Sequence, residues 1–252
     1  MTSSNGSAQA SLNNLIADFN DHPDLPEALN EVASQYEERR RYEKARQLYQ
    51  YIVDNLPESE YVILSPGGVI MADIGLGNDA NAQAAIDNLI ADFNDHLGLP
   101  EVVFVIGEQY YNKAFIYKKE GLDTEARGCF EKALAIWESI TELPPNAVYP
   151  AQAYLFSGEC YCRLGQHQTA IGYYQKVVDD WPDYENRWYA LFLIGCGYEQ
   201  LRDSGDVEKS LAKARIQAAY EWVLLEYPDC PAAKAADNWL KCYVKSSQGD
   251  QK

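Results

Sequence analysis

The chain has 252 residues, with 21 basic and 38 acidic side chains, which gives a formal net charge of −17 at pH 7. Such a surface repels phosphate groups, so we expect neither a nucleic-acid partner nor binding to an anionic membrane surface. No apolar run approaches the roughly 18 residues that a membrane span needs. Hydrophobic residues make up 47% of the chain, enough for a continuous core.

The first helix is expected over residues 8–21, in a segment that occurs twice. Residues 7–26 read SAQASLNNLIADFNDHPDLP and residues 81–100 read NAQAAIDNLIADFNDHLGLP, with 14 of 20 positions identical. This duplication indicates a repeated structural unit. The segment matches the second helix of a unit without a first helix before it. We expect either a natural cap or a start inside a longer array.

Two later units share one spacing of small, aromatic and proline residues, at intervals of 3, 9, 4 and 8. The two sets are Ala33, Tyr36, Ala45, Tyr49, Pro57 and Gly158, Tyr161, Ala170, Tyr174, Pro182. Small residues would let paired helices approach, aromatic residues would fill the space beside them, and the proline would end the second helix. This pattern resembles the tetratricopeptide-repeat (TPR) family, which stacks helix-turn-helix units of about 34 residues.

The second unit departs most from the pattern, because Ser65-Pro66-Gly67-Gly68 interrupts its first helix. In a helix interior, proline costs about 3 kcal/mol and each glycine about 1 kcal/mol. We favour a helix that begins late, near Pro66, because proline suits the first turn. The alternative is a loop exposed at a binding groove. The second helix of this unit carries Ala82, Ile86, Leu89 and Phe93.

The third unit should have longer helices, roughly 100–120 and 123–142, because Ala126 follows Tyr110 by 16 residues. The fifth unit should have an enlarged turn over residues 203–210, followed by a capping helix over about 231–244 with Trp239, Leu240 and Tyr243 on its apolar side.

The resemblance therefore implies an all-α, right-handed superhelical solenoid of about twelve helices without strands. A single solenoid would cover 8–244, between flexible tails 1–7 and 245–252. Its parts are a half unit 8–22, units of approximately 25–58, 60–95, 99–144, 148–182 and 184–228, and the cap 231–244.

The resemblance also implies a non-enzymatic scaffold that binds a peptide or helix of a partner protein in a concave groove. The first helix of each unit would line this groove with carboxylates and exposed aromatic anchors, which favour a basic partner. In the first unit these residues are Glu27, Asn30, Ser34 and Glu37. The principal candidates are Phe104, Glu108, Tyr111, Asn112, Glu159, Tyr189, Phe192 and Glu199, and further groove positions are Glu101, Gln152, Leu155, Arg163, Cys196 and Gln200.

Two other functions stay open. The start inside a unit suggests a regulatory or sensing segment of a larger multidomain protein. Residues 218–240, AAYEWVLLEYPDCPAAKAADNWL, are similar to helical repeats of bacterial envelope-assembly proteins, which suggests a periplasmic adaptor. The start of the chain lacks a signal-peptide pattern, so we expect a cytoplasmic protein. A monomer or a weak end-to-end dimer is expected.

Catalytic and metal-binding patterns are absent from the sequence. The three histidines and six cysteines form neither an HExxH nor a CxxC pair, and no phosphate loop or GxSxG motif occurs. We therefore expect no cofactor, no metal and no enzymatic activity. The cysteines are expected to be reduced core residues, with a Cys230–Cys242 bridge as the alternative.

Overall fold

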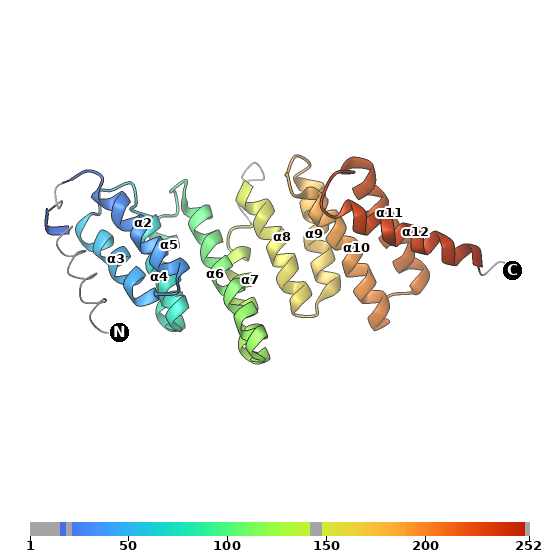
Figure 1. Cartoon of the computed structure of the whole chain (residues 1–252), viewed down its shortest axis with the longest axis horizontal. Coiled ribbons are helices and arrows are strands. Elements are labelled where there is room, and N and C mark those ends of the chain that lie inside the picture. Colours follow the sequence, from blue (N-terminus) through green and yellow to red (C-terminus); the bar gives the residue numbers. More distant parts are fainter. Residues whose placement is uncertain (1–15, 19–21, 142–147, 250–252) are drawn as a thin grey trace. The chain divides into compact units, whose positions relative to one another are not determined.

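The computed structural model describes residues 16–18, 22–141 and 148–249. Every regular element within these ranges is a helix (Figure 1). The helices are α2 (Leu25–Glu38), α3 (Tyr42–Asn55), α4 (Leu64–Leu76), α5 (Asp79–Asp92), α6 (Leu99–Glu120), α7 (Asp123–Glu138), α8 (Val148–Arg163), α9 (His167–Asp180), α10 (Arg187–Ser204), α11 (Lys209–Glu226) and α12 (Ala233–Gly249). The all-α, TPR-like fold class is thereby confirmed.

The chain divides into two compact units, residues 1–109 and 110–252, and the boundary falls within α6. Each unit is built from antiparallel helix pairs in which consecutive helices pack together. The half unit expected over 8–22 lies almost entirely outside the described residues. The expected single solenoid over 8–244 stays a prediction.

In the first unit, α2 and α3 pack through apolar stripes with helical spacing. Leu25, Leu29 and Ala33 recur every four residues and are buried. On α3 the matching stripe includes Ala45 and Tyr49, which are also buried. The two stripes form one core cluster with Ala72 of α4, because residues three and four apart share one face of a helix.

Helix α4 begins late, as we favoured, with Pro66 in its first turn. The alternative of an exposed loop is wrong, because Gly67 and Gly68 are helical and buried. A Cβ atom added at Gly68 would lie 2.6 Å from the Tyr49 ring, and one at Gly67 would lie 2.5 Å from Cγ1 of Val102. The two glycines therefore let α4 lie directly against α3 and the start of α6, which offsets their low helix propensity.

A buried carboxylate connects three elements of the first unit. Asp73 on α4 is only 2% exposed. Its Oδ1 accepts a hydrogen bond from Nε of Arg46 on α3 at 2.9 Å and one from Nδ2 of Asn78, before α5, at 2.9 Å. Both partners are needed, because an unpaired buried carboxylate would strongly destabilise the fold.

The second unit has an aromatic core between α6, α7 and α8. The Tyr111 ring lies 5.6 Å from Phe130 and 5.9 Å from Phe156, measured between ring centroids. Trp137 is fully buried beside them. Such edge-to-face pairs add to the stabilisation from burial. On α8, a Cβ atom at Gly158 would lie 2.5 Å from the Tyr174 ring of α9, as expected for a small residue at a close helix crossing.

Some expected boundaries shift in the second unit. Helix α7 ends at Glu138, where we expected about 142. The enlarged turn expected over 203–210 is wrong in extent, because α10 continues to Ser204 and α11 begins at Lys209. Gly205 ends α10 in a left-handed conformation with φ of 82°, which glycine adopts without strain.

The six cysteines all lie in the described part of the chain and are free. Cys129 and Cys160 are buried, three others are half-buried, and Cys242 is exposed. The alternative of a Cys230–Cys242 bridge is therefore wrong. None of the described helices combines the length and apolar character that crossing a bilayer requires.

Candidate protein-binding surface

The structure divides the eight principal candidate residues by exposure. Phe104 is 6% exposed and Tyr111 is 9% exposed, so the expectation that they are exposed anchors is wrong. The further groove position Leu155 is also buried, at 2%. Helix α6 carries apolar residues on several sides. Its place as the first helix of a repeat did not reveal which of these sides neighbouring helices cover.

The other candidates reach solvent to different degrees. Asn112 is exposed, whereas the remaining five are half-buried: Glu108, Glu159, Tyr189, Phe192 and Glu199. The ring of Phe192 stacks on Tyr220 at 5.4 Å, so part of its surface belongs to the core. The accessible candidates in the second unit lie on α6, α8 and α10, the first helices of successive pairs.

Glu159 on α8 brings three candidate residues together. Its Oε2 accepts a hydrogen bond of 2.5 Å from the Tyr111 hydroxyl of α6. Burial, the charge of Glu159 and a hydrogen bond to it raise the pKa of Tyr189 on α10 to about 12. Arg163, one turn further along α8, places its guanidinium carbon 5.2 Å from the centre of the Phe115 ring. Glu159 thus connects the first helices of three consecutive pairs.

A tyrosine–glutamate pair recurs in two repeats. The Tyr49 hydroxyl donates to Glu37 at 3.3 Å, and the Tyr220 hydroxyl donates to Glu199 at 3.2 Å. In both repeats the glutamate follows the small residue of the first helix by four positions, and the tyrosine comes from the second helix. The spacing of small and aromatic residues does not by itself reveal these pairs, although a carboxylate four residues after the small residue could have indicated them.

The repeat formed by α8 and α9 lacks this pair. Cys162 occupies the position four residues after Gly158. The hydroxyl of Tyr174 is buried and has no hydrogen-bond partner. Burial raises the pKa of the Cys162 thiol, so this residue is a poor substitute for a carboxylate acceptor.

Burial removes part of the hydration of three carboxylates, those of Glu37, Glu108 and Glu199. Burial raises the pKa of Glu37 to about 7, and this effect outweighs the hydrogen bond from Tyr49, which lowers the pKa. Burial also raises the pKa of Glu108 and of Glu199. A carboxylate that has lost part of its hydration gains more from a cationic partner than a fully exposed one does.

The first unit has an open polar depression of about 720 Å³ beside α2. Three of the predicted groove residues, Glu27, Asn30 and Ser34, line it together with Tyr61. Four further polar residues complete the lining: Glu31, Gln35, Glu38 and Arg39. Three of the four predicted groove residues of α2 thus share one solvent-facing surface, whereas Glu37 is half-buried and does not line it. Within the described ranges, no three His, Cys, Asp or Glu side chains are placed to hold a metal ion.

Sequence models of the tetratricopeptide repeat match residues 4–60 and residues 152–184. The first range contains the helix pair α2–α3, and the second contains most of α8 and all of α9. Both pairs carry the common spacing. The chain therefore contains tetratricopeptide repeats within these two ranges. Such repeats are typical of scaffolds that bind other proteins, and the fold is typically non-catalytic.

One curated relative is the Photosystem I assembly protein Ycf3 of Synechococcus sp. (strain CC9605), 22% identical over 135 residues, which are 54% of this chain and 78% of Ycf3. Among solved structures, BtubC from P. vanneervenii is 15% identical, with 89% of this chain and 91% of BtubC covered and a TM-score of 0.49. The putative kinesin light chain TPR-like repeats of Podosopora anserina are 16% identical, with coverage of 79% and 96% and a TM-score of 0.46.

Proposed function

We propose that the chain is a non-enzymatic scaffold that binds a basic segment of a partner protein along α8, α10 and the second half of α6. The observation that carries this proposal is the position of Glu159, held between Tyr111 and Tyr189. Glu199, a second half-buried carboxylate, lies on α10 of the same unit. The proposed partner is a peptide or a helix, as the repeat family suggests.

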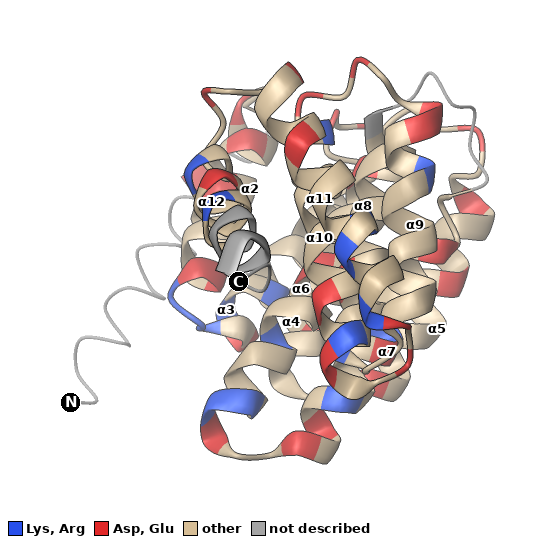
Figure 2. Ribbon diagram, turned by 90° about the vertical axis from the view of Figure 1, so that its right-hand side faces the viewer, with Lys and Arg blue, Asp and Glu red and all other residues tan. Residues whose placement is uncertain are grey.

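The tyrosines orient the Glu159 side chain, because a phenol donates a hydrogen bond to a carboxylate oxygen. Preorganised acceptors lower the entropy that is lost when a partner is bound. Acidic residues, drawn in red, are spread over many helices in Figure 2. The net charge of −17 would therefore steer a basic segment toward the protein from a distance.

The polar depression beside α2 is a second candidate contact for a basic segment. Its lining contains three acidic residues, Glu27, Glu31 and Glu38, and one basic residue, Arg39.

An assembly adaptor is the second candidate, and the curated relative favours it. That relative is named as an assembly protein, and it shares 135 aligned residues with this chain. An adaptor would use the same acidic surface to hold a subunit before the subunit joins its complex.

The test is quantitative capture from a lysate of the source organism. The binding-surface variant is Glu159→Gln with Glu199→Gln, and the matched control is Glu131→Gln with Glu221→Gln. The two control residues are exposed on the second helices α7 and α11. Their substitution removes two negative charges, as many as the binding-surface variant removes. A partner that is lost from the first variant and retained by the control supports the proposal. Equal loss from both would show that net charge alone attracts the partner, and equal retention by both would exclude this surface.

A Phe104→Ala/Phe192→Ala variant is a poorer probe. Because Phe104 is buried, its truncation would leave a cavity and cost about 3–5 kcal/mol of stability. Loss of binding would then not separate unfolding from loss of contact. Tyr189→Phe is cleaner, because it removes only the hydroxyl that reaches Glu159.

A further inference from the structure

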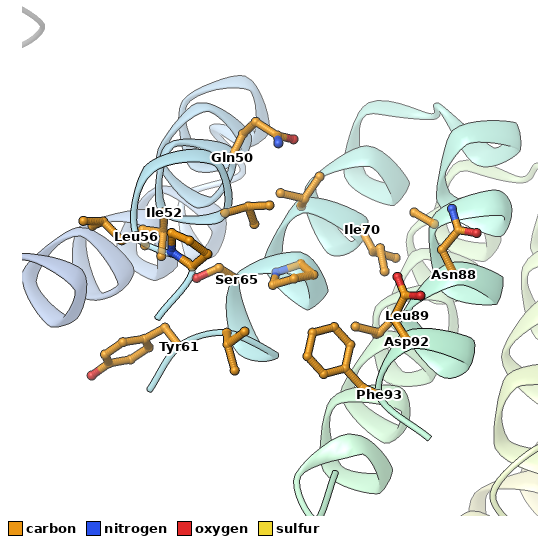
Figure 3. A pocket seen from close by; sticks show the side chains of 16 residues that line it. Gln50, Ile52, Leu56, Tyr61, Ser65, Ile70, Asn88, Leu89, Asp92 and Phe93 are labelled. Carbon is orange, nitrogen blue, oxygen red and sulfur yellow. The ribbon is translucent and has the colours of Figure 1, made fainter. Parts of the chain in front are cut away.

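Buried hydroxyls without a hydrogen-bond partner are unusual, because pairing stabilises a buried polar group. The described part of the chain holds several, among them those of Ser65 and Tyr174. Ser65 lines an apolar cavity of about 370 Å³ between α3, α4 and α5 (Figure 3). Its hydroxyl has almost no accessible surface, so a molecule in that cavity would not reach it. Tyr174 differs, because a side chain beside it can itself acquire an oxygen.

The Tyr174 ring crosses its first helix in the same way as the Tyr220 ring of the next repeat. A Cβ atom added at Gly158 would lie 2.5 Å from Cε1 of Tyr174. Cε1 of Tyr220 is likewise the atom nearest to a Cβ added at Gly195. From this position the Tyr220 hydroxyl donates a hydrogen bond to Glu199, four residues after Gly195.

Cys162 takes the place of that glutamate in the repeat formed by α8 and α9, four residues after Gly158. The equivalent crossing therefore directs the Tyr174 hydroxyl toward Cys162. Burial raises the pKa of Tyr174, and among the neighbouring charges that of Cys162 contributes most. Tyr174 is only 1% exposed. Its hydroxyl can thus be paired only by an atom attached to a side chain next to it.

The Cys162 thiol lies where it can react with a small oxidant. The residue is half-buried, so part of its side chain remains open to solvent. Its Sγ lies 3.6 Å from Nδ1 of His167, the first residue of α9. Burial raises the pKa of the thiol, which keeps it protonated at neutral pH. Because the thiolate is the nucleophilic form, a base beside the sulfur is needed, and the His167 imidazole provides one.

We propose that hydrogen peroxide oxidises Cys162 to a sulfenic acid, whose oxygen accepts the missing hydrogen bond from Tyr174. The sulfur attacks one peroxide oxygen, so that an S–O bond forms and the O–O bond breaks. Nδ1 of His167 takes the thiol proton and passes it to the departing hydroxide, which leaves as water. The sulfur is oxidised and the peroxide is reduced. This modification site does not depend on the proposed scaffold function.

The hydrogen bond from Tyr174 should lengthen the lifetime of the oxidised form. A sulfenic acid is lost when it condenses with a thiol or is oxidised further. A hydrogen bond of ordinary net strength changes an equilibrium about 2–10-fold. The oxidised Cys162 should therefore persist longer than a sulfenic acid that no buried donor holds.

The experiment measures this lifetime in the full chain. The protein is treated with hydrogen peroxide, catalase removes the excess, and dimedone, which alkylates sulfenic acids, is added after increasing delays. Peptide mass spectrometry gives the labelled fraction at each cysteine. Cys196 is the internal control, because it is also half-buried on a first helix, but its neighbour Tyr220 already donates to Glu199. We expect the label at Cys162 to persist at least about 3-fold longer than at Cys196.

Two variants separate the roles of the neighbouring residues. Tyr174→Phe should shorten the lifetime at Cys162 about 2–10-fold and leave Cys196 unchanged. His167→Gln should lower the initial labelling of Cys162 without shortening its lifetime, and unchanged initial labelling would exclude His167 as the base. Absence of label at Cys162, a Cys162–Cys196 disulfide in its place, equal lifetimes at the two cysteines, or an unchanged lifetime in Tyr174→Phe would overturn the proposal.

A comparison without oxidation tests the direction of the Tyr174 hydroxyl. Cys162→Glu introduces the carboxylate that the equivalent position of the next repeat carries. Tyr174→Phe should then lower Tm by about 3–12 °C in the Cys162→Glu protein, because a hydrogen bond to a charged group is lost. In wild type the same substitution should leave Tm unchanged or raise it. Equal effects of Tyr174→Phe in the two proteins would show that the hydroxyl does not face Cys162 and would overturn the proposal.

Discussion

Replacement of Gly158 by alanine tests whether a glycine sets the spacing between α8 and α9. The added Cβ atom would lie 2.5 Å from Cε1 and 2.8 Å from Cδ1 of Tyr174. That ring is 1% exposed and belongs to the core of the second unit, so it has little freedom to move. Overpacking of this kind costs about 1–3 kcal/mol. Alanine also gains about 1 kcal/mol of helix propensity over glycine.

Gly172→Ala is the matched control, because Gly172 lies on the partner helix α9 and a Cβ atom there meets nothing within 4 Å. It should therefore stabilise the protein by about 1 kcal/mol. We expect the unfolding free energies of the two variants to differ by about 1–3 kcal/mol, with Gly158→Ala the less stable. At roughly 2–4 °C per kcal/mol for a chain of this size, this is a gap of about 2–12 °C in Tm.

Tryptophan fluorescence during thermal unfolding is a suitable assay for this comparison. All five tryptophans lie within residues 137–239, so their signal reports the second unit alone. Placing both substitutions in one helix pair also avoids differences between repeats that unfold separately. Equal Tm values for the two variants would refute the reasoning, because the Tyr174 ring would then not limit the approach of α8.

Three further predictions concern polar groups. The pKa of Glu37 in the folded protein, about 7, exceeds the reference value of 4.5, so its contribution to stability is full below pH 4.5 and is lost as pH rises through 7. At about 1.4 kcal/mol per pKa unit, the stability of Glu37→Gln relative to wild type should rise by about 3 kcal/mol between pH 4.5 and 8 in denaturant titrations. Parallel stability curves for the two proteins would contradict this assignment. Tyr174→Phe removes a buried hydroxyl without a partner and should leave stability unchanged or raise it by about 1 kcal/mol in urea unfolding, so a clear loss would indicate a hidden partner. Arg46→Ala leaves buried Asp73 with only Asn78 and should cost about 3 kcal/mol at pH 7 by the same method, whereas Arg46→Ala with Asp73→Asn should recover part of that loss.

The sequence by itself determined the helix pairs and their spacing. The intervals between Ala33, Tyr49 and Pro57 mark α2, α3 and the end of the second helix, because helical periodicity and proline act over a few neighbouring residues. The same local rules predicted a late start of α4 near Pro66, and the helix begins two residues earlier, at Leu64. Acidic composition, visible in the sequence alone, also favoured a basic protein partner over nucleic acid.

Tertiary structure decided which side chains are accessible and which of them meet. Periodicity defines the faces of α6 but not which face a neighbouring helix covers, so the burial of Phe104 and Tyr111 was missed. The hydrogen bond from Tyr111 to Glu159 joins residues 48 positions apart, and no local pattern indicates it. The cavity beside Ser65 likewise depends on how three helices pack, because a void is defined by the distances between elements and not by the residues of any one of them.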